Sequence, residues 1–163
     1  MKSIPGMYIR TIDMLNKFFG YALAFIMAFM TIIIFWQVIA RYVVGSSLAW
    51  SEELSRFLMI FMIMIGASLA LREKQLISVE VVPEMLRGRV KKWLTVIVHL
   101  ISIFFYIVII MFGWKVAQSF GNQIAPGTGI SMFFIYLSLP LGGVLLLLNS
   151  ITCILEEFIE RKE

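Results

Sequence analysis

The stretch from Phe35 to Leu71, FWQVIARYVVGSSLAWSEELSRFLMIFMIMIGASLAL, joins the end of one long apolar run to the start of the next. Four charged residues stand at this junction, namely Arg41, Glu52, Glu53 and Arg56. A charged group buried in lipid without a partner costs about 3 kcal/mol or more. We therefore expect these side chains to be satisfied by one another or by a partner subunit.

The apolar run after Arg56 cannot span a bilayer by itself. It has 15 uncharged residues and ends at Leu71. That length makes about 22 Å of helix, whereas the hydrocarbon core is about 30 Å thick. The helix must therefore begin near Leu48, which places the charges in its first turns. On a helix Glu52 lies four residues and Glu53 three residues before Arg56, so either carboxylate can reach the guanidinium.

Two interpretations of these charges remain open. In the first, the two glutamates are acids favoured at a helix N-terminus, which Ser46 or Ser47 caps. In the second, the four charges form a packed polar cluster that fixes two helices, or a partner subunit, at the outer edge of the membrane. The second predicts that Arg56→Ala lowers the yield of an assembled complex more than Arg41→Ala, because Arg41 ends its helix and can extend to water.

The composition indicates an integral membrane protein. Of the 163 residues, 61% are hydrophobic, and the mean hydropathy is +0.94, which is too apolar for a soluble domain of this size. The expected fold class is all-α, with residues 1–163 forming one membrane domain. We expect transmembrane helices at about residues 18–40, 48–71, 93–114 and 132–155, and amphipathic interfacial segments at about 4–17 and 76–92.

The basic residues predict the orientation. Three precede the first run, six lie between the second and third, and two follow the fourth, which puts eleven on one side of the membrane. The other side has three, namely Arg41, Arg56 and Lys115. Cytoplasmic segments carry the excess of lysine and arginine, so both termini are predicted to be cytoplasmic.

The third and fourth runs carry local signals. Trp93 and Trp114 are expected to mark the two membrane interfaces of the third helix, and His99 inside it is expected to be a hydrogen-bonded packing residue. Pro140 removes a backbone hydrogen bond and predicts a bend in the fourth helix. Further along that helix, the polar residues expected to bond to a neighbouring helix are Asn149, Ser150 and Thr152. Three glutamates are expected to end the helix in water, namely Glu156, Glu157 and Glu160.

The sequence offers no enzyme chemistry. It has no metal-ligand spacing and no glycine-rich phosphate loop, and one histidine excludes an intrachain bis-histidine haem site. Cys153 is the only cysteine, so no intrachain disulfide can form. We expect no cofactor, no catalytic, substrate-binding or metal-binding residue, and no nucleic-acid partner. The centres of the four runs also lack charged residues, which a transporter acting alone usually has.

Three segments carry a resemblance to a known family. They are Arg41-Tyr42, the run Leu48-Ala49-Trp50-Ser51-Glu52-Glu53-Leu54-Ser55-Arg56, and Gly66-Ala67 with Leu69-Ala70-Leu71-Arg72. In these, and in its pattern of four runs, essentially the whole chain resembles the DctQ-like small membrane subunit of TRAP (tripartite ATP-independent periplasmic) transporters. The most specific element is Trp-Ser-Glu-Glu-x-x-Arg. Leu76 and Ser131 depart from the residues common in that family, histidine and proline, so no role is assigned to either position.

The resemblance implies a small permease subunit in the bacterial inner membrane. Its implied partners are a large membrane subunit in a stable heterodimer, a transient periplasmic substrate-binding protein, and phospholipid. The large subunit would carry an organic acid with sodium by an elevator motion, and the small subunit would be its scaffold. A structural or partner-interface role carries over only to Arg41, Trp50, Glu52, Glu53 and Arg56.

Two other classes of protein stay open at this point. A small homo-oligomeric four-helix exporter would need an acidic residue in mid-membrane, where the first run has only Gln37. A structural adaptor of another membrane complex would have the same composition. Only the Trp-Ser-Glu-Glu-x-x-Arg element argues against the adaptor.

The predicted topology can be tested with single cysteines. In a chain with Cys153 replaced, a cysteine at Ser46 should react with a membrane-impermeant maleimide from outside the cell, because that position lies in an outer loop. A cysteine at Ser78 should react only after the membrane is opened. The reverse pattern would contradict the orientation.

Overall fold

The computed structural model describes residues 4–45, 48–73, 75 and 89–159. Its elements are α1 (Ile4–Ile39), the π-helical turn η1 (Ala40–Val44), α2 (Ala49–Arg72), α4 (Arg89–Ser119), α5 (Met132–Tyr136) and α6 (Ser138–Ile159). Among the described residues, four segments are long and apolar enough to cross a membrane: Gly6–Val43, Ala49–Arg72, Val96–Ser119 and Met132–Glu156. This confirms the predicted all-α fold with four spanning helices. Most of the interfacial segment expected at 76–92, and the proposed caps Ser46 and Ser47, lie outside the described residues.

The first helix is longer than the sequence suggested. Residues 4–17 and 18–40 were expected as two segments, but α1 runs without interruption through both and continues as η1. Nothing in residues 6–39 breaks it, because the isolated Gly20 is tolerated within a helix. The turn ends at Gly45, whose left-handed φ of 71° and N–H bond to the carbonyl of Ala40 form a helix C-cap.

The third spanning helix, α4, also extends beyond its expected ends. Trp93 and Trp114 lie inside it, and it ends only at Ser119. Interfacial tryptophans report depth in a membrane and do not stop a helix. The helix ends where the N–H of Gly121 bonds to the carbonyl of Gln118 at 3.3 Å.

The bend expected from Pro140 is present as the break between α5 and α6 at Leu137. Proline has no N–H to donate to the carbonyl of Tyr136, four residues earlier. Nearby, the hydroxyl of Ser138 donates to the carbonyl of Ile135 at 2.7 Å. Pro140 therefore sits in the first turn of α6, where its missing N–H is tolerated.

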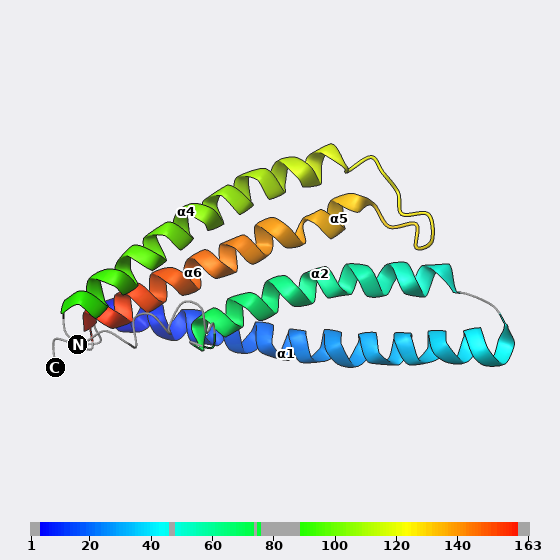
Figure 1. Cartoon of the computed structure of the whole chain (residues 1–163), viewed down its shortest axis with the longest axis horizontal. Coiled ribbons are helices and arrows are strands. Elements are labelled where there is room, and N and C mark those ends of the chain that lie inside the picture. The colour runs from blue at the N-terminus through cyan, green and yellow to red at the C-terminus, as the bar shows by residue number, and fades with distance from the viewer. Residues whose placement is uncertain (1–3, 46–47, 74, 76–88, 160–163) are drawn as a thin grey trace.

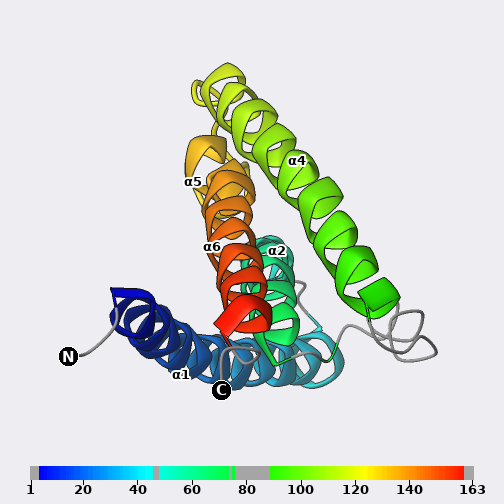
Figure 2. The same cartoon turned by 90° about the vertical axis from the view of Figure 1, so that its left-hand side faces the viewer.

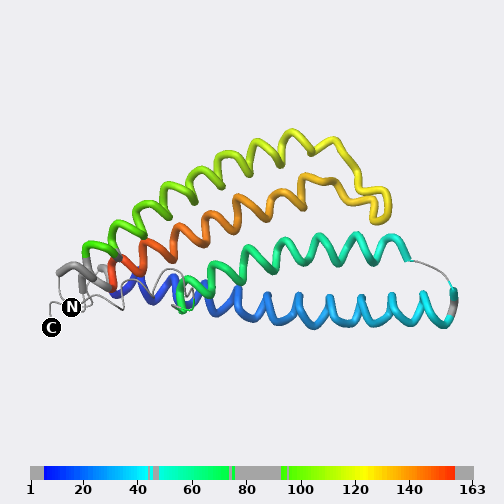
Figure 3. Tube along the Cα trace, viewed as in Figure 1, coloured from blue at the N-terminus to red at the C-terminus, as the bar shows by residue number. Residues whose placement is uncertain are grey.

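The helices form an open layer instead of a closed bundle. Seen from the end, α2 and α6 lie between α1 and α4 (Figure 2). Packing runs from α1 to α2, from α2 to α6 and from α6 to α4, with a smaller direct contact between α1 and α6, whereas no Cα atom of α1 lies within 8 Å of one in α4 among the described residues. We call the end with the start of α1 and the end of α6 the terminal end, and the end with residues 120–131 the loop end (Figure 1). The α1–α2 pair and the α4–α6 pair diverge toward the loop end (Figure 3).

Glycines let α6 approach both of its neighbours closely. A Cβ atom at Gly142 would lie 2.6 Å from Cβ of Met64 on α2, and one at Gly143 would lie 2.8 Å from Cγ1 of Ile110 on α4. Lipid is as apolar as leucine, so membrane helices associate by close packing, which small residues permit. The position of α6 between α2 and α4 therefore depends on these two glycines.

We predict that Gly142→Ala destabilises the chain, because the new methyl group meets the root of a side chain that cannot rotate away. Overpacking of this kind costs about 1 to 3 kcal/mol. Gly20→Ala is the matched control, since its Cβ would meet only Cδ2 of Leu69 at 3.9 Å. Thermal unfolding in detergent should show a lower midpoint for Gly142→Ala alone. Equal midpoints would contradict the tight α2–α6 contact.

Candidate functional site

The residues predicted to form a polar cluster lie at the loop end, but they do not form one group. Arg56 donates to Glu52 across one helical turn, with 2.7 Å between Nη2 and Oε1. This is the predicted i,i+4 pair. Its side chains are 69% and 49% exposed, and both belong to α2. An exposed pair of this kind contributes about 0 to 1 kcal/mol, so it does not fix one helix to another.

Glu53 makes a different set of contacts. Its Oε2 accepts hydrogen bonds from the backbone N–H of Gly127 at 2.9 Å and of Thr128 at 2.7 Å, and from the hydroxyl of Thr128 at 3.1 Å. Consecutive helical residues point in directions about 100° apart, which separates this carboxylate from that of Glu52. Glu53 therefore joins α2 to the connection between α4 and α5.

The remaining two predicted residues are exposed. Arg41 lies in η1 and makes no hydrogen bond or ion pair with another described residue. Trp50, in the first turn of α2, is 42% exposed. The neutral group of four charges expected from the sequence is thus not assembled within this part of the chain.

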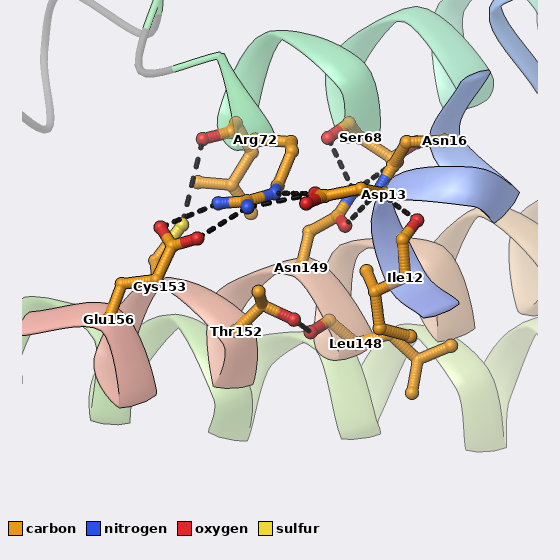
Figure 4. Close-up of polar contacts among 11 residues, drawn as sticks. Ile12, Asp13, Asn16, Ser68, Arg72, Leu148, Asn149, Thr152, Cys153 and Glu156 are labelled. Atoms are coloured by element: carbon orange, nitrogen blue, oxygen red, sulfur yellow. Dashed lines mark hydrogen bonds and ion pairs between the residues drawn. The ribbon is translucent and has the colours of Figure 1, made fainter. Parts of the chain in front are cut away.

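A second polar cluster, which the sequence analysis did not predict, lies at the terminal end (Figure 4). Arg72 at the end of α2 donates from Nε to Asp13 of α1 at 2.8 Å. Its Nη1 donates to Glu156 of α6 at 2.7 Å, and its Nη2 bonds to the second oxygen of the same carboxylate. The Arg72 side chain is only 15% exposed. One guanidinium therefore joins three helices, with the bidentate geometry that suits arginine and carboxylate.

Glu156 was expected to end its helix in water, and that expectation is wrong. Its side chain is 24% exposed and paired with Arg72. The two residues are 84 positions apart, and each alone looks like an ordinary charge at a membrane interface. The sequence does show opposite charges at the ends of two apolar runs, which is compatible with an ion pair between them. Only the tertiary packing determines which of these charges meet.

Amide groups connect the same three helices three to seven residues closer to the loop end. Asn16 and Asn149 donate to each other at 2.7 and 2.9 Å, and Asn149 also donates to the carbonyl of Ser68 at 2.7 Å (Figure 4). Asn16 is 8% exposed and Asn149 1%. This confirms the expectation that Asn149 bonds to neighbouring helices.

Of the other two polar residues considered on α6, Ser150 contacts another helix and Thr152 bonds within its own helix. Ser150 Oγ lies 2.9 Å from Nδ1 of His99 on α4, and His99 is 6% exposed, which confirms a hydrogen-bonded packing residue. Thr152 instead donates to the carbonyl of Leu148 on its own helix at 2.8 Å, so the expected bond to another helix is wrong. Within the described ranges, no group of three His, Cys, Asp or Glu side chains is placed to hold a metal ion.

Comparison with known proteins adds the family to this geometry. Residues 30–160 match the family described as tripartite ATP-independent periplasmic transporters, DctQ component. A putative TRAP transporter small permease protein of Haemophilus influenzae is 30% identical over 131 residues, which are 80% of this chain and 81% of the relative. The sialic acid TRAP transporter small permease protein SiaQ of Vibrio cholerae is 25% identical over 126 residues, which are 77% of this chain and 73% of that protein.

A longer relative contains a similar segment. The sialic acid TRAP transporter permease protein SiaT of Haemophilus influenzae is 27% identical over 115 residues, which are 71% of this chain but only 19% of that protein. The match of the family over most of the sequence, together with the four apolar helices, determines the class. The chain belongs to the DctQ family of small membrane components of TRAP transporters, and is therefore part of a transporter and not an enzyme.

Proposed function

We propose that this chain is the scaffold of a TRAP transporter in the bacterial inner membrane and forms a stable heterodimer with a large membrane subunit. The carrying observation is the open layer of helices, in which only 6% of the residues in the apolar stretch of the first span are buried, against 39% in the last span. Exposed apolar side chains along α1 include Phe25, Ile32 and Phe35. The relative SiaT supports this partner, because the segment similar to this chain is part of one much longer permease polypeptide.

The transport step is assigned to the large subunit. In the scaffold, the buried amides of Asn16 and Asn149 bond to each other, and His99 bonds to Ser150, so these groups serve helix packing. We assign sodium-coupled, elevator-type movement of an organic acid to the large subunit, with a periplasmic binding protein delivering the acid transiently. The sialic acid in the names of two relatives supports an organic acid as the class of cargo.

The remaining apolar surface is assigned to phospholipid, and both termini to the cytoplasm. The start of α1 and the end of α6 lie at the same end of the layer (Figure 1), which supports placing both termini on one side. The eleven basic residues of the expected inner segments favour the cytoplasmic side. Four of the loop-end residues singled out in the sequence remain candidates for contacts with the large subunit, because all four are exposed: Arg41, Trp50, Glu52 and Arg56.

The scaffold role predicts that this chain binds the large subunit but transports nothing by itself. The tagged chain, co-expressed with a large TRAP subunit of its own organism, should elute with it as one peak in size exclusion without crosslinker. The chain reconstituted alone in liposomes should show no organic-acid uptake above lipid background. Sodium-driven uptake by this chain alone would contradict the proposal.

The terminal-end cluster gives a second prediction, with a matched control in the same helix. Arg72→Ala should lower the thermal stability of the chain alone, because it removes charge-assisted hydrogen bonds, worth about 1.5 to 3 kcal/mol, that join three helices. Arg56→Ala removes the same side chain from an exposed pair within α2 and should change little in the chain alone. A larger loss of stability in Arg56→Ala than in Arg72→Ala would contradict this prediction and support the larger role that the sequence suggested for Arg56.

A further inference from the structure

The connection between α4 and α5 is a folded element with a defined shape. Backbone hydrogen bonds cross it from Met132 to Gln123 and from Ala125 to Ile130, each at 2.9 Å. The hydroxyl of Ser131 donates to the carbonyl of Gly121 at 2.7 Å. Ala125, at its centre, is 1% exposed. Residues 120–131 therefore behave as a compact turn and not as a loose tether.

Glu53 is the point at which α2 meets this turn. One carboxylate oxygen receives three hydrogen bonds from Gly127 and Thr128. The packing around Gly127 is a separate observation, since a Cβ atom there would lie 2.8 Å from the same oxygen and 3.2 Å from the carbonyl of Ala49. The turn is thus both hydrogen-bonded to α2 and in close contact with its first residues.

Among the hydrogen bonds given for the described residues, those of Glu53 link the two helix pairs at the loop end. Among the hydrogen bonds and ion pairs of the described residues, those between α1–α2 and the rest of the chain fall into two groups. One group contains Arg72, Asn149 and Cys153 at the terminal end, and the other contains only Glu53. The pairs diverge toward the loop end (Figure 3), so their separation there depends on this contact.

We propose that Glu53 is a positioning residue that holds the 120–131 turn, and with it α5, against the start of α2. It sets the separation of the α1–α2 and α4–α6 pairs at the loop end. A scaffold whose shape is set before association loses less conformational freedom on binding its partner. The consequence for the large subunit rests on the proposed function, whereas the consequence for the shape of this chain does not.

Distance measurements by pulsed electron paramagnetic resonance test the proposal on the full chain in nanodiscs with Cys153 replaced by alanine. Spin labels at Tyr42→Cys and Gln123→Cys, both exposed, report on the loop end. Labels at Met14→Cys and Leu100→Cys, which are 69% and 56% exposed, report on the terminal end. Glu53→Ala should broaden the distance distribution at the loop end and leave the terminal end narrow.

Glu52→Ala is the matched control, because it removes the same carboxylate one residue away and leaves the turn bound. It should keep the loop-end distribution narrow. Glu53→Gln keeps an oxygen that can accept from the two backbone N–H groups and should be narrower than Glu53→Ala. A narrow distribution in Glu53→Ala, or equal broadening in Glu52→Ala, would overturn the proposal.

A second variant perturbs the contact from the side of the turn without changing charge. Gly127→Ala should broaden the same distribution, because its methyl group displaces the Glu53 carboxylate. In the complex with the large subunit, Glu53→Ala should lower uptake severalfold at native complex yield, and native uptake would overturn the transport consequence. If the chain forms no such complex, the proposed function fails, while the distances still decide the role of Glu53.

Discussion

A polar group inside a membrane has to find its partner within protein, because lipid offers no hydrogen bond. Asn149 meets this requirement through Asn16 on α1 and the Ser68 carbonyl on α2. Arg72, at the adjacent end of α2, is paired with carboxylates on α1 and α6. Each of these hydrogen bonds forms only when the helices stand at one position along their axes. Together they fix the axial positions of α1, α2 and α6 relative to one another at the terminal end. Ser55 is an exception among the described residues, since its buried hydroxyl has no hydrogen-bond partner.

Helix α2 connects the whole layer. It carries Arg72 at its last residue, which bonds to α1 and α6, and Glu53 in its first turns, which bonds to the connection between α4 and α5. Between these two positions, Met64 packs against Gly142 of α6. The helix pairs thus meet at both ends and at one close crossing, which leaves the outer faces of α1 and α4 uncovered.

This open architecture suits a subunit that works beside a larger protein. A closed bundle would bury its apolar surface within itself, whereas here no Cα atom of α1 lies within 8 Å of one in α4 in the described part of the chain. The polar groups that do lie among the helices are used for packing. Such a chain offers surface and shape to a partner, and the family to which it belongs is one of membrane transporter components.

The sequence by itself determined the class of fold. The length of the four apolar runs is enough to specify spanning helices, because a fixed bilayer thickness demands a fixed length of helix. The i,i+4 pair of Glu52 and Arg56 was also readable, since helical spacing alone brings them together. The bend near Pro140 followed from its missing N–H.

Only the tertiary structure decided which charges and amides meet. Asp13, Arg72 and Glu156 come from three different helices, and nothing local marks them as partners. Glu53 was grouped with Arg56 because they are near in sequence, yet its partners are the backbone N–H groups of Gly127 and Thr128, 74 and 75 residues away. Almost every residue has a backbone N–H, so the residue types do not show which N–H groups bind Glu53. The pairing of distant charges and amides depends on how the helices pack, so it could not be predicted from the sequence either.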